Sequence, residues 1–128
     1  MLRILLSILT GWILGKERKR HEKSGGSRTM AIVCLSACLV AILSQKLSTV
    51  YHFDFFRLMA YTIAGISFIG NGVITQYKQN VEGLTTASTL LINVILGFLI
   101  GLEFYFYGIV GTVIMYVLLE SKYWKSKE

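Results

Sequence analysis

Apolar residues fill five segments of the chain, and short polar stretches separate these segments. The segments run over residues 2–15, 29–45, 57–77, 84–102 and 104–119. Apolar segments that approach 20 residues are typical of membrane-spanning helices, because a helix of that length crosses a hydrocarbon layer of about 30 Å. The pattern therefore predicts an all-α integral membrane protein. We expect a compact bundle of about five transmembrane helices, in a single domain over residues 1–128.

Two parts of this pattern allow another interpretation. The first segment is short and follows Arg3, as in a signal peptide, and its removal would leave four spans. No small-x-small cleavage motif precedes Lys16, so a retained span is the preferred interpretation. The last two segments could form one long bent element. Their combined length, and the polar Glu103 between them, favour two helices joined by a tight turn.

The charged residues are few and clustered, and their distribution predicts the orientation of the bundle. Hydrophobic residues make up 54% of the chain and charged residues 16%, with a formal net charge of +6. In a five-span topology most Lys and Arg residues lie in the loop 16–28 and the tail 121–128, whereas the opposite side carries Arg3, Lys46 and Arg57. Because Lys and Arg favour the cytoplasmic side, we expect the N-terminus outside the cell. The basic surplus then needs no nucleic-acid partner.

This topology brings several polar residues to the cytoplasmic side, at the ends of the first four segments. They are Glu17, Arg18, Arg28, Thr29, Asn71, Glu82, Thr85 and Thr86. The N-termini of the second and fourth helices would add partial positive charge there, with Thr29 and Thr85 as candidate capping residues. One interpretation is a polar binding pocket. The other is an internal network of ion pairs and caps that locks the helices together, with Glu17 as partner for a buried arginine.

Glycine is the residue expected to control how closely these helices approach one another. The chain contains no proline, so a break in a helix would have to come from glycine. Small residues let membrane helices pack closely, and the candidates for such packing are Gly11, Gly15, Gly65, Gly70, Gly72, Gly97 and Gly101. Those around Asn71 could instead open the third helix and expose backbone carbonyls, as in transporters.

On the outer side, Asp54 and Arg57 are three residues apart at the start of the third helix. Asp54 is expected to cap that helix and to pair with Arg57. Cys34 and Cys38 lie four apart on one helix and read as small buried side chains. We find no nucleophile with a base, no metal-ligand spacing and no phosphate-binding loop in the sequence. We therefore expect neither enzymatic activity, nor a bound metal, nor a cofactor.

Taken in order, these motifs resemble those of the MgtC/SapB family of bacterial inner-membrane proteins, from about Gly11 to Gly111. Glycines followed by Glu17-Arg18 are similar to the first family motif. The segments 26–29 and 65–72 and the pair Asp54 and Arg57 follow, and Gly83-Leu84-Thr85-Thr86-Ala87 closes the series. Lys16, Asn71 and Leu91 depart from the family pattern. The soluble C-terminal domain of longer members is absent from this sequence.

The resemblance implies a multi-pass protein of the bacterial plasma membrane that is linked to magnesium limitation, virulence or the regulation of a membrane ATPase. With no catalytic groups in view, the leading hypothesis is a non-enzymatic modulator of a partner, either an ATPase or a transporter. The rival hypothesis is a small transporter or channel for magnesium or another ion, which would use Asn71. The lipid bilayer is one expected partner. A homodimer through small residues such as Gly97 and Gly101 is a further hypothesis.

Overall fold

The computed structural model describes residues 1–52 and 54–125, except for the side chain of Tyr77. Its helices are α1 (Leu2–Arg20), α2 (Ser27–Tyr51), α3 (Phe55–Val73), α4 (Leu84–Gly101) and α5 (Tyr105–Trp124). Between α3 and α4 lies an antiparallel hairpin of β1 (Thr75–Tyr77) and β2 (Asn80–Glu82). The predicted separation of the last two segments is confirmed. Residues 126–128 of the predicted basic tail lie outside the described residues.

The hairpin is a correction to the purely helical prediction, in which the third helix ran to residue 77. Helix α3 ends at Val73, and the β-branched residues Ile74 and Thr75 continue the chain in extended form. Gly83 closes the hairpin with a positive φ of 84°, and a methyl group there would collide with the carbonyl oxygen of Val73. Only glycine fits this position, because both the positive φ and the contact with Val73 exclude a side chain. Helix α4 begins at the next residue, Leu84.

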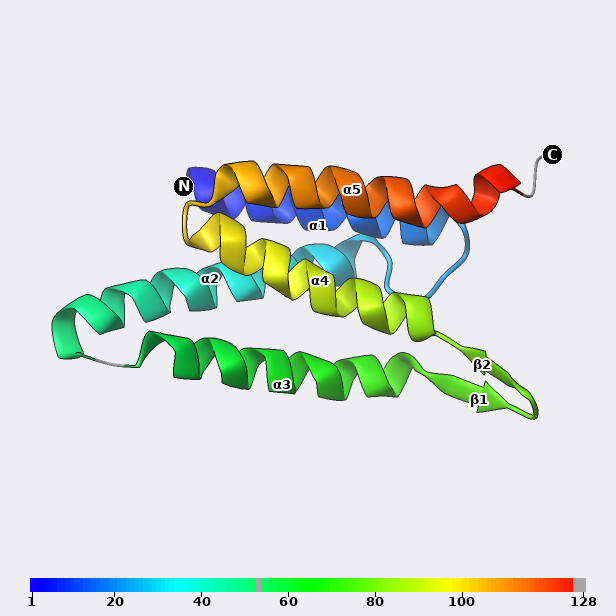
Figure 1. Cartoon of the computed structure of the whole chain (residues 1–128), viewed down its shortest axis with the longest axis horizontal. Helices are drawn as coiled ribbons and strands as arrows, with labels where there is room; N and C mark the ends of the chain where they lie inside the picture. Colours follow the sequence, from blue (N-terminus) through cyan, green and yellow to red (C-terminus); the bar gives the residue numbers. More distant parts are fainter. Residues whose placement is uncertain (53, 126–128) are drawn as a thin grey trace.

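Successive helices run in opposite directions along the long axis of the molecule (Figure 1). The end of α1, the start of α2, the β-hairpin, the start of α4 and the end of α5 lie together, and we call this the hairpin end. The opposite end holds the N-terminus, the end of α2, the start of α3 and the short connection 102–104. This alternation agrees with the predicted sharing of one side by the loop 16–28 and the tail, of which residues 121–125 are described.

Helix α2 lies at the centre of the packing and makes its most extensive contacts with α1 and α4. Helix α3 packs on α4 and α2, whereas α5 packs on α1 and α4, so that α3 and α5 lie on opposite sides of α4 (Figure 1). Fully buried side chains on α2 include Met30, Cys34, Cys38 and Ala41. The most extensive helix packing is therefore that of α1 and α4 on α2, and buried side chains of α3 and α5, such as Ile66 and Leu119, complete the apolar core.

Glycines bring α1, α2 and α4 into backbone contact. A methyl group on Gly97 of α4 would lie 2.5 Å from the carbonyl oxygen of Cys34, and one on Gly101 would lie 2.7 Å from that of Cys38. On the other side of α2, Gly11 lies against the Met30 carbonyl and Gly15 against the backbone of Ser27. No side chain fits at these points, which is how small residues act in membrane helix packing.

Three of the seven candidate packing glycines, all on α3, do not have this role. Gly65 and Gly72 on α3 face open space, with no atom within 4 Å of an added methyl group. Gly70 makes ordinary contact with Ala87 of α4, at 3.6 Å from its Cβ. The prediction failed there because glycine spacing does not tell which face of a helix meets a neighbour. Helix α3 is thus attached more loosely than α1.

The outer surface of the bundle is strongly apolar. Large apolar side chains are exposed on the outward faces of α1, α3 and α5, for example Leu5, Phe68 and Ile114. By length and composition α2 and α4 qualify as membrane-crossing helices, with mean hydropathies of 2.0 and 1.9. Extended apolar surface of this kind indicates contact with lipid or protein.

A methyl group on α1 tests the backbone contact between α1 and α2. We expect Gly11→Ala to cost about 2 kcal/mol or more, because the Met30 backbone cannot move aside without separating the two helices. Unfolding by SDS titration in mixed micelles measures the effect. Gly65→Ala is the matched control and should be neutral or stabilising by up to about 1 kcal/mol. Equal effects of the two substitutions would contradict this packing.

Candidate functional site

Glu17 and Arg18 form a buried ion pair at the hairpin end of α1. Their side chains are 0% and 3% exposed. Arg18 Nε donates to Glu17 Oε2 at 2.5 Å, and Arg18 Nη2 donates to Glu17 Oε1 at 2.9 Å. Each charge is neutralised by the other through two hydrogen bonds, which makes burial of the pair tolerable.

His21, which directly follows α1, lies between this pair and the end of α5. His21 Nε2 lies 3.9 Å from Glu17 Oε1 and 3.7 Å from Glu120 Oε1. The His21 ring stacks on Tyr123 with 3.4 Å between centroids, and Arg20 Nη1 lies 3.4 Å from Glu120. His21 is thus partly buried. The end of α5 therefore rests on the end of α1.

Among the described residues, the other members of the predicted cytoplasmic cluster form no hydrogen bond or ion pair with Glu17 or Arg18. Thr86 is buried near Gly25. The remaining residues lie exposed at or near the same end of the bundle: Arg28, Thr29, Asn71, Glu82 and Thr85. Among the described residues of this predicted cluster, Glu17 and Arg18 are the two that hydrogen bonds join directly. The end of the bundle at which each residue lies was predictable, but the direction of each side chain was not.

The predicted threonine caps are wrong. The N-cap of α2 is Gly26 and that of α4 is Gly83, and neither makes a side-chain capping bond. Helix α2 begins at Ser27 and helix α4 at Leu84, so that each helix has already begun before its predicted capping threonine. Thr29 and Thr85 consequently lie within the first turn, where their hydroxyl groups cannot reach the free backbone amides as an N-cap does.

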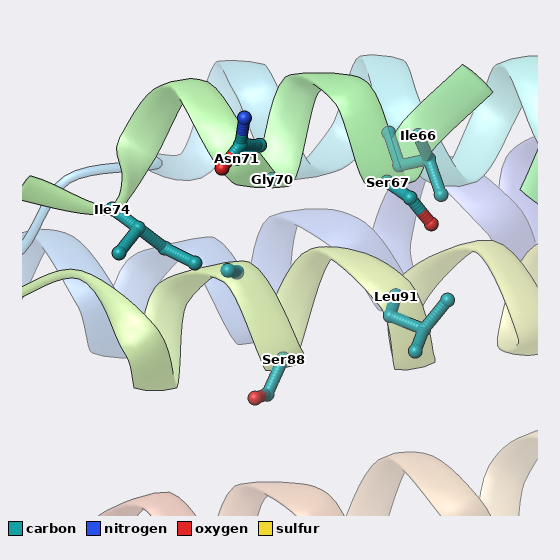
Figure 2. Close-up of a pocket in the computed structure, with 8 residues that line it drawn as sticks. Ile66, Ser67, Gly70, Asn71, Ile74, Ser88 and Leu91 are labelled. Carbon is teal, nitrogen blue, oxygen red and sulfur yellow. The ribbon is translucent and has the colours of Figure 1, made fainter. Parts of the chain in front are cut away.

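A groove between α3 and α4 is the larger of two surface hollows that we consider. Its volume is about 370 Å³, and both helices supply its walls (Figure 2). The groove is lined by Ile66, Ser67, Gly70, Asn71, Ile74, Ala87, Ser88 and Leu91. Both serine hydroxyl groups donate to backbone carbonyls of their own helices, at 2.9 Å each. Within residues 1–52 and 54–125, the exposed carboxamide of Asn71 has no hydrogen-bond partner.

At the opposite end, the predicted cap of α3 is present but the predicted ion pair is not. Asp54 Oδ1 accepts hydrogen bonds from the backbone amides of Phe56 and Arg57, at 3.2 and 3.4 Å. In the part of the chain that the structure describes, the Arg57 guanidinium makes no ion pair with Asp54. The capping geometry directs the carboxylate to the helix backbone and leaves the Arg57 side chain in solvent or lipid headgroups.

Two polar contacts inside the bundle were missed in the sequence. Asn93 of α4 is fully buried, and its Nδ2 donates to the Met30 carbonyl of α2 at 2.6 Å. Arg3 of α1 donates to the Gly101 carbonyl at 3.0 Å and forms a salt bridge with Glu103. Both contacts join residues more than 60 positions apart, so no local sequence pattern could predict them. Among the described residues, no three His, Cys, Asp or Glu side chains are grouped to hold a metal.

An apolar helical bundle with a charged, basic end and a glycine-packed core defines a membrane-associated α-helical protein. The chain belongs to the MgtC family, whose model matches residues 4–127. The resemblance seen in the sequence motifs is thereby confirmed. No solved structure matches the chain.

Curated relatives include proteins from three bacteria. An uncharacterized protein of Haemophilus influenzae is 32% identical over 90% of this chain and 52% of its own. The "Putative magnesium transporter YhiD" of Escherichia coli K12 is 31% identical, over 94% and 59% respectively. "Protein MgtC" of Salmonella typhimurium is 33% identical, over 90% and 48%. The chain thus spans about half the length of the curated relatives it matches.

Replacing one partner of the buried ion pair tests its role in the fold. We expect Arg18→Met to cost about 3–5 kcal/mol, because the Glu17 carboxylate would stay buried without a counter-charge. The double variant Glu17→Met with Arg18→Met should recover most of this loss. Thermal unfolding in detergent measures both. A double variant as unstable as Arg18→Met would contradict the account of the pair as mutual neutralisation.

Proposed function

We propose that this protein is a multi-pass protein of the bacterial plasma membrane that binds a membrane protein and modulates its activity without catalysing a reaction. The α3–α4 groove is the observation that carries this proposal. It lies on the outside of the bundle, between a loosely attached helix and the core, and it contains the unpaired carboxamide of Asn71.

A polar side chain on the outer face of a membrane bundle has few favourable partners in lipid. Asn71 lies within the last turn of α3, where its carboxamide can both donate and accept a hydrogen bond. A helix of a partner protein could satisfy both groups, whereas lipid chains cannot. The small residues Ser67, Gly70 and Ala87 leave room for such a helix to approach closely.

In the proposed topology all five helices cross the bilayer. They contain 18 to 25 residues each, which corresponds to about 27 Å or more of helix. The basic hairpin end would face the cytoplasm and the N-terminus the outside. The ion pair between Glu17 and Arg18 then neutralises the two buried charges of α1 where that helix leaves the membrane.

The partner we propose is a membrane ATPase or transporter connected with magnesium supply. The link to magnesium comes from the name of one relative, the putative magnesium transporter YhiD, and from the resemblance to the MgtC family. A second copy of this chain is the alternative occupant of the groove. Crosslinking distinguishes a partner protein from a second copy of this chain. A crosslinked homodimer has twice the mass of the chain and yields peptides of this sequence alone.

The name of the relative YhiD, a putative magnesium transporter, also favours a second candidate function. This function is a small transporter for magnesium or another ion. The pairing of Glu17 with Arg18 speaks against it, since the buried carboxylate already has its counter-charge and is not free for a passing cation. Magnesium uptake into liposomes that contain the purified protein and a magnesium indicator distinguishes the two functions. Saturable magnesium uptake above that of empty liposomes would favour the transporter.

Photocrosslinking from position 71 tests the proposed groove. We expect a photoreactive residue in place of Asn71 to capture a membrane protein in cells short of magnesium, because a partner helix would lie against it. The same residue at Val117 is the matched control, since this position is exposed on α5, which does not line the groove. Mass spectrometry of the adducts measures both. Equal adducts at both positions, or none, would contradict the proposal.

Substitution of Asn71 separates binding from folding. Asn71→Leu should leave the folded yield unchanged or raised, because leucine suits an exposed position in lipid. It should lower capture from a photoreactive residue placed at the neighbouring Ser67 at least about fivefold, as expected for loss of one interhelical hydrogen bond of about 1 kcal/mol. Unchanged capture would show that Asn71 does not contact the partner.

A further inference from the structure

A second hollow lies between α1 and α5, separate from the α3–α4 groove. Its volume is about 330 Å³, and it is lined by Ile13, Lys16, Glu17, Arg20 and Tyr116. Ile13, Lys16 and Arg20 are spaced three and four residues apart and therefore share one face of α1. The apolar residue comes first along α1 and the basic residues follow toward the hairpin end. The hollow thus changes from apolar to cationic along the helix.

The carboxylates near this hollow do not cancel its positive charge. The Glu17 carboxylate is occupied by both bonds from Arg18. Glu120 lies 3.4 Å from Arg20, but the Arg20 side chain is 67% exposed, and such surface pairs are weak. Lys16 is exposed, and within residues 1–52 and 54–125 it forms no ion pair. An anion entering the hollow would therefore meet two basic side chains that can turn toward it.

We propose that the α1–α5 hollow binds an anionic phospholipid. Lys16 and Arg20 would hold the phosphodiester through charge-assisted hydrogen bonds, and an acyl chain would lie along Ile13 and Tyr116. Long basic side chains at the level of lipid headgroups attract anionic lipids by about fivefold in binding for each charge. A free phosphate ion would use the basic residues but would gain nothing from the apolar part of the hollow.

This inference is independent of the proposed partner groove, because the two sites share no residue. Lipid binding at α1 and α5 could hold even if Asn71 captured no protein. It would also fix the contact between the ends of these helices, where His21 stacks on Tyr123.

Native mass spectrometry of the purified chain in mild detergent tests the lipid site. Phosphatidylglycerol and phosphatidylcholine with the same acyl chains are added in equal amounts, and the bound fraction of each is measured. We expect wild type to prefer phosphatidylglycerol, and Lys16→Gln with Arg20→Gln to weaken its binding about tenfold. The control is Lys19→Gln with Lys23→Gln, which removes the same charge from exposed residues outside the hollow and should change binding less than about twofold.

Two outcomes would overturn the inference. Equal losses in both double variants would mean that the general positive charge of the hairpin end attracts the lipid. Displacement of phosphatidylglycerol by millimolar inorganic phosphate would mean a site for a soluble anion. Thermal unfolding of each variant checks the fold. If the double variant is unfolded, the single variant Lys16→Gln replaces it, with an expected loss of about threefold to fivefold.

Discussion

Direct contact between helix backbones holds this protein together, and the rest of the structure depends on it. Helix α2 is enclosed by α1 on one side and α4 on the other, and at each crossing a glycine replaces the side chain that would keep the backbones apart. Dispersion between closely packed backbones must supply much of the stability, because lipid gives helices little hydrophobic reason to associate. Buried hydrogen bonds such as that from Asn93 to Met30 then fix the register of α4 on α2.

Close backbone packing of three helices in this way leaves the other two at the periphery. Helix α3 packs on α4 without a close glycine-to-backbone contact. Helix α5 packs on α1 and α4 through the buried Leu119 and through polar and aromatic groups at its end. Each peripheral helix therefore borders an open hollow, and the two hollows differ in chemistry. The one beside α3 offers an unpaired carboxamide and small residues, whereas the one beside α5 offers basic side chains above an apolar wall. The proposals of a protein partner and of a lipid follow from this difference.

Features that depend on local composition, such as the helices, were predicted correctly from the sequence. The predictions failed for contacts that depend on the direction in which a side chain points. Apolar segments located all five helices, and Asp54 was correctly placed as the cap of α3. Gly97 and Gly65 look alike in sequence, yet one lies against the Cys34 backbone and the other faces open space. The β-hairpin depends on the tight fit of Gly83 against Val73. The contact of Glu120 with His21 joins residues 99 positions apart, so no local pattern could reveal it.

The two native cysteines offer the most direct test of the enclosed α2, because both thiols are fully buried on the face that α1 and α4 cover. The measurement is the rate of modification by a maleimide in mild detergent. The reference is Ser36→Cys in a chain with Cys34→Ala and Cys38→Ala, which places one thiol on the exposed face of the same helix. The account predicts that Cys34 and Cys38 react at least about tenfold more slowly than position 36, since they react only when the helices separate. Equal rates at the three positions would contradict it.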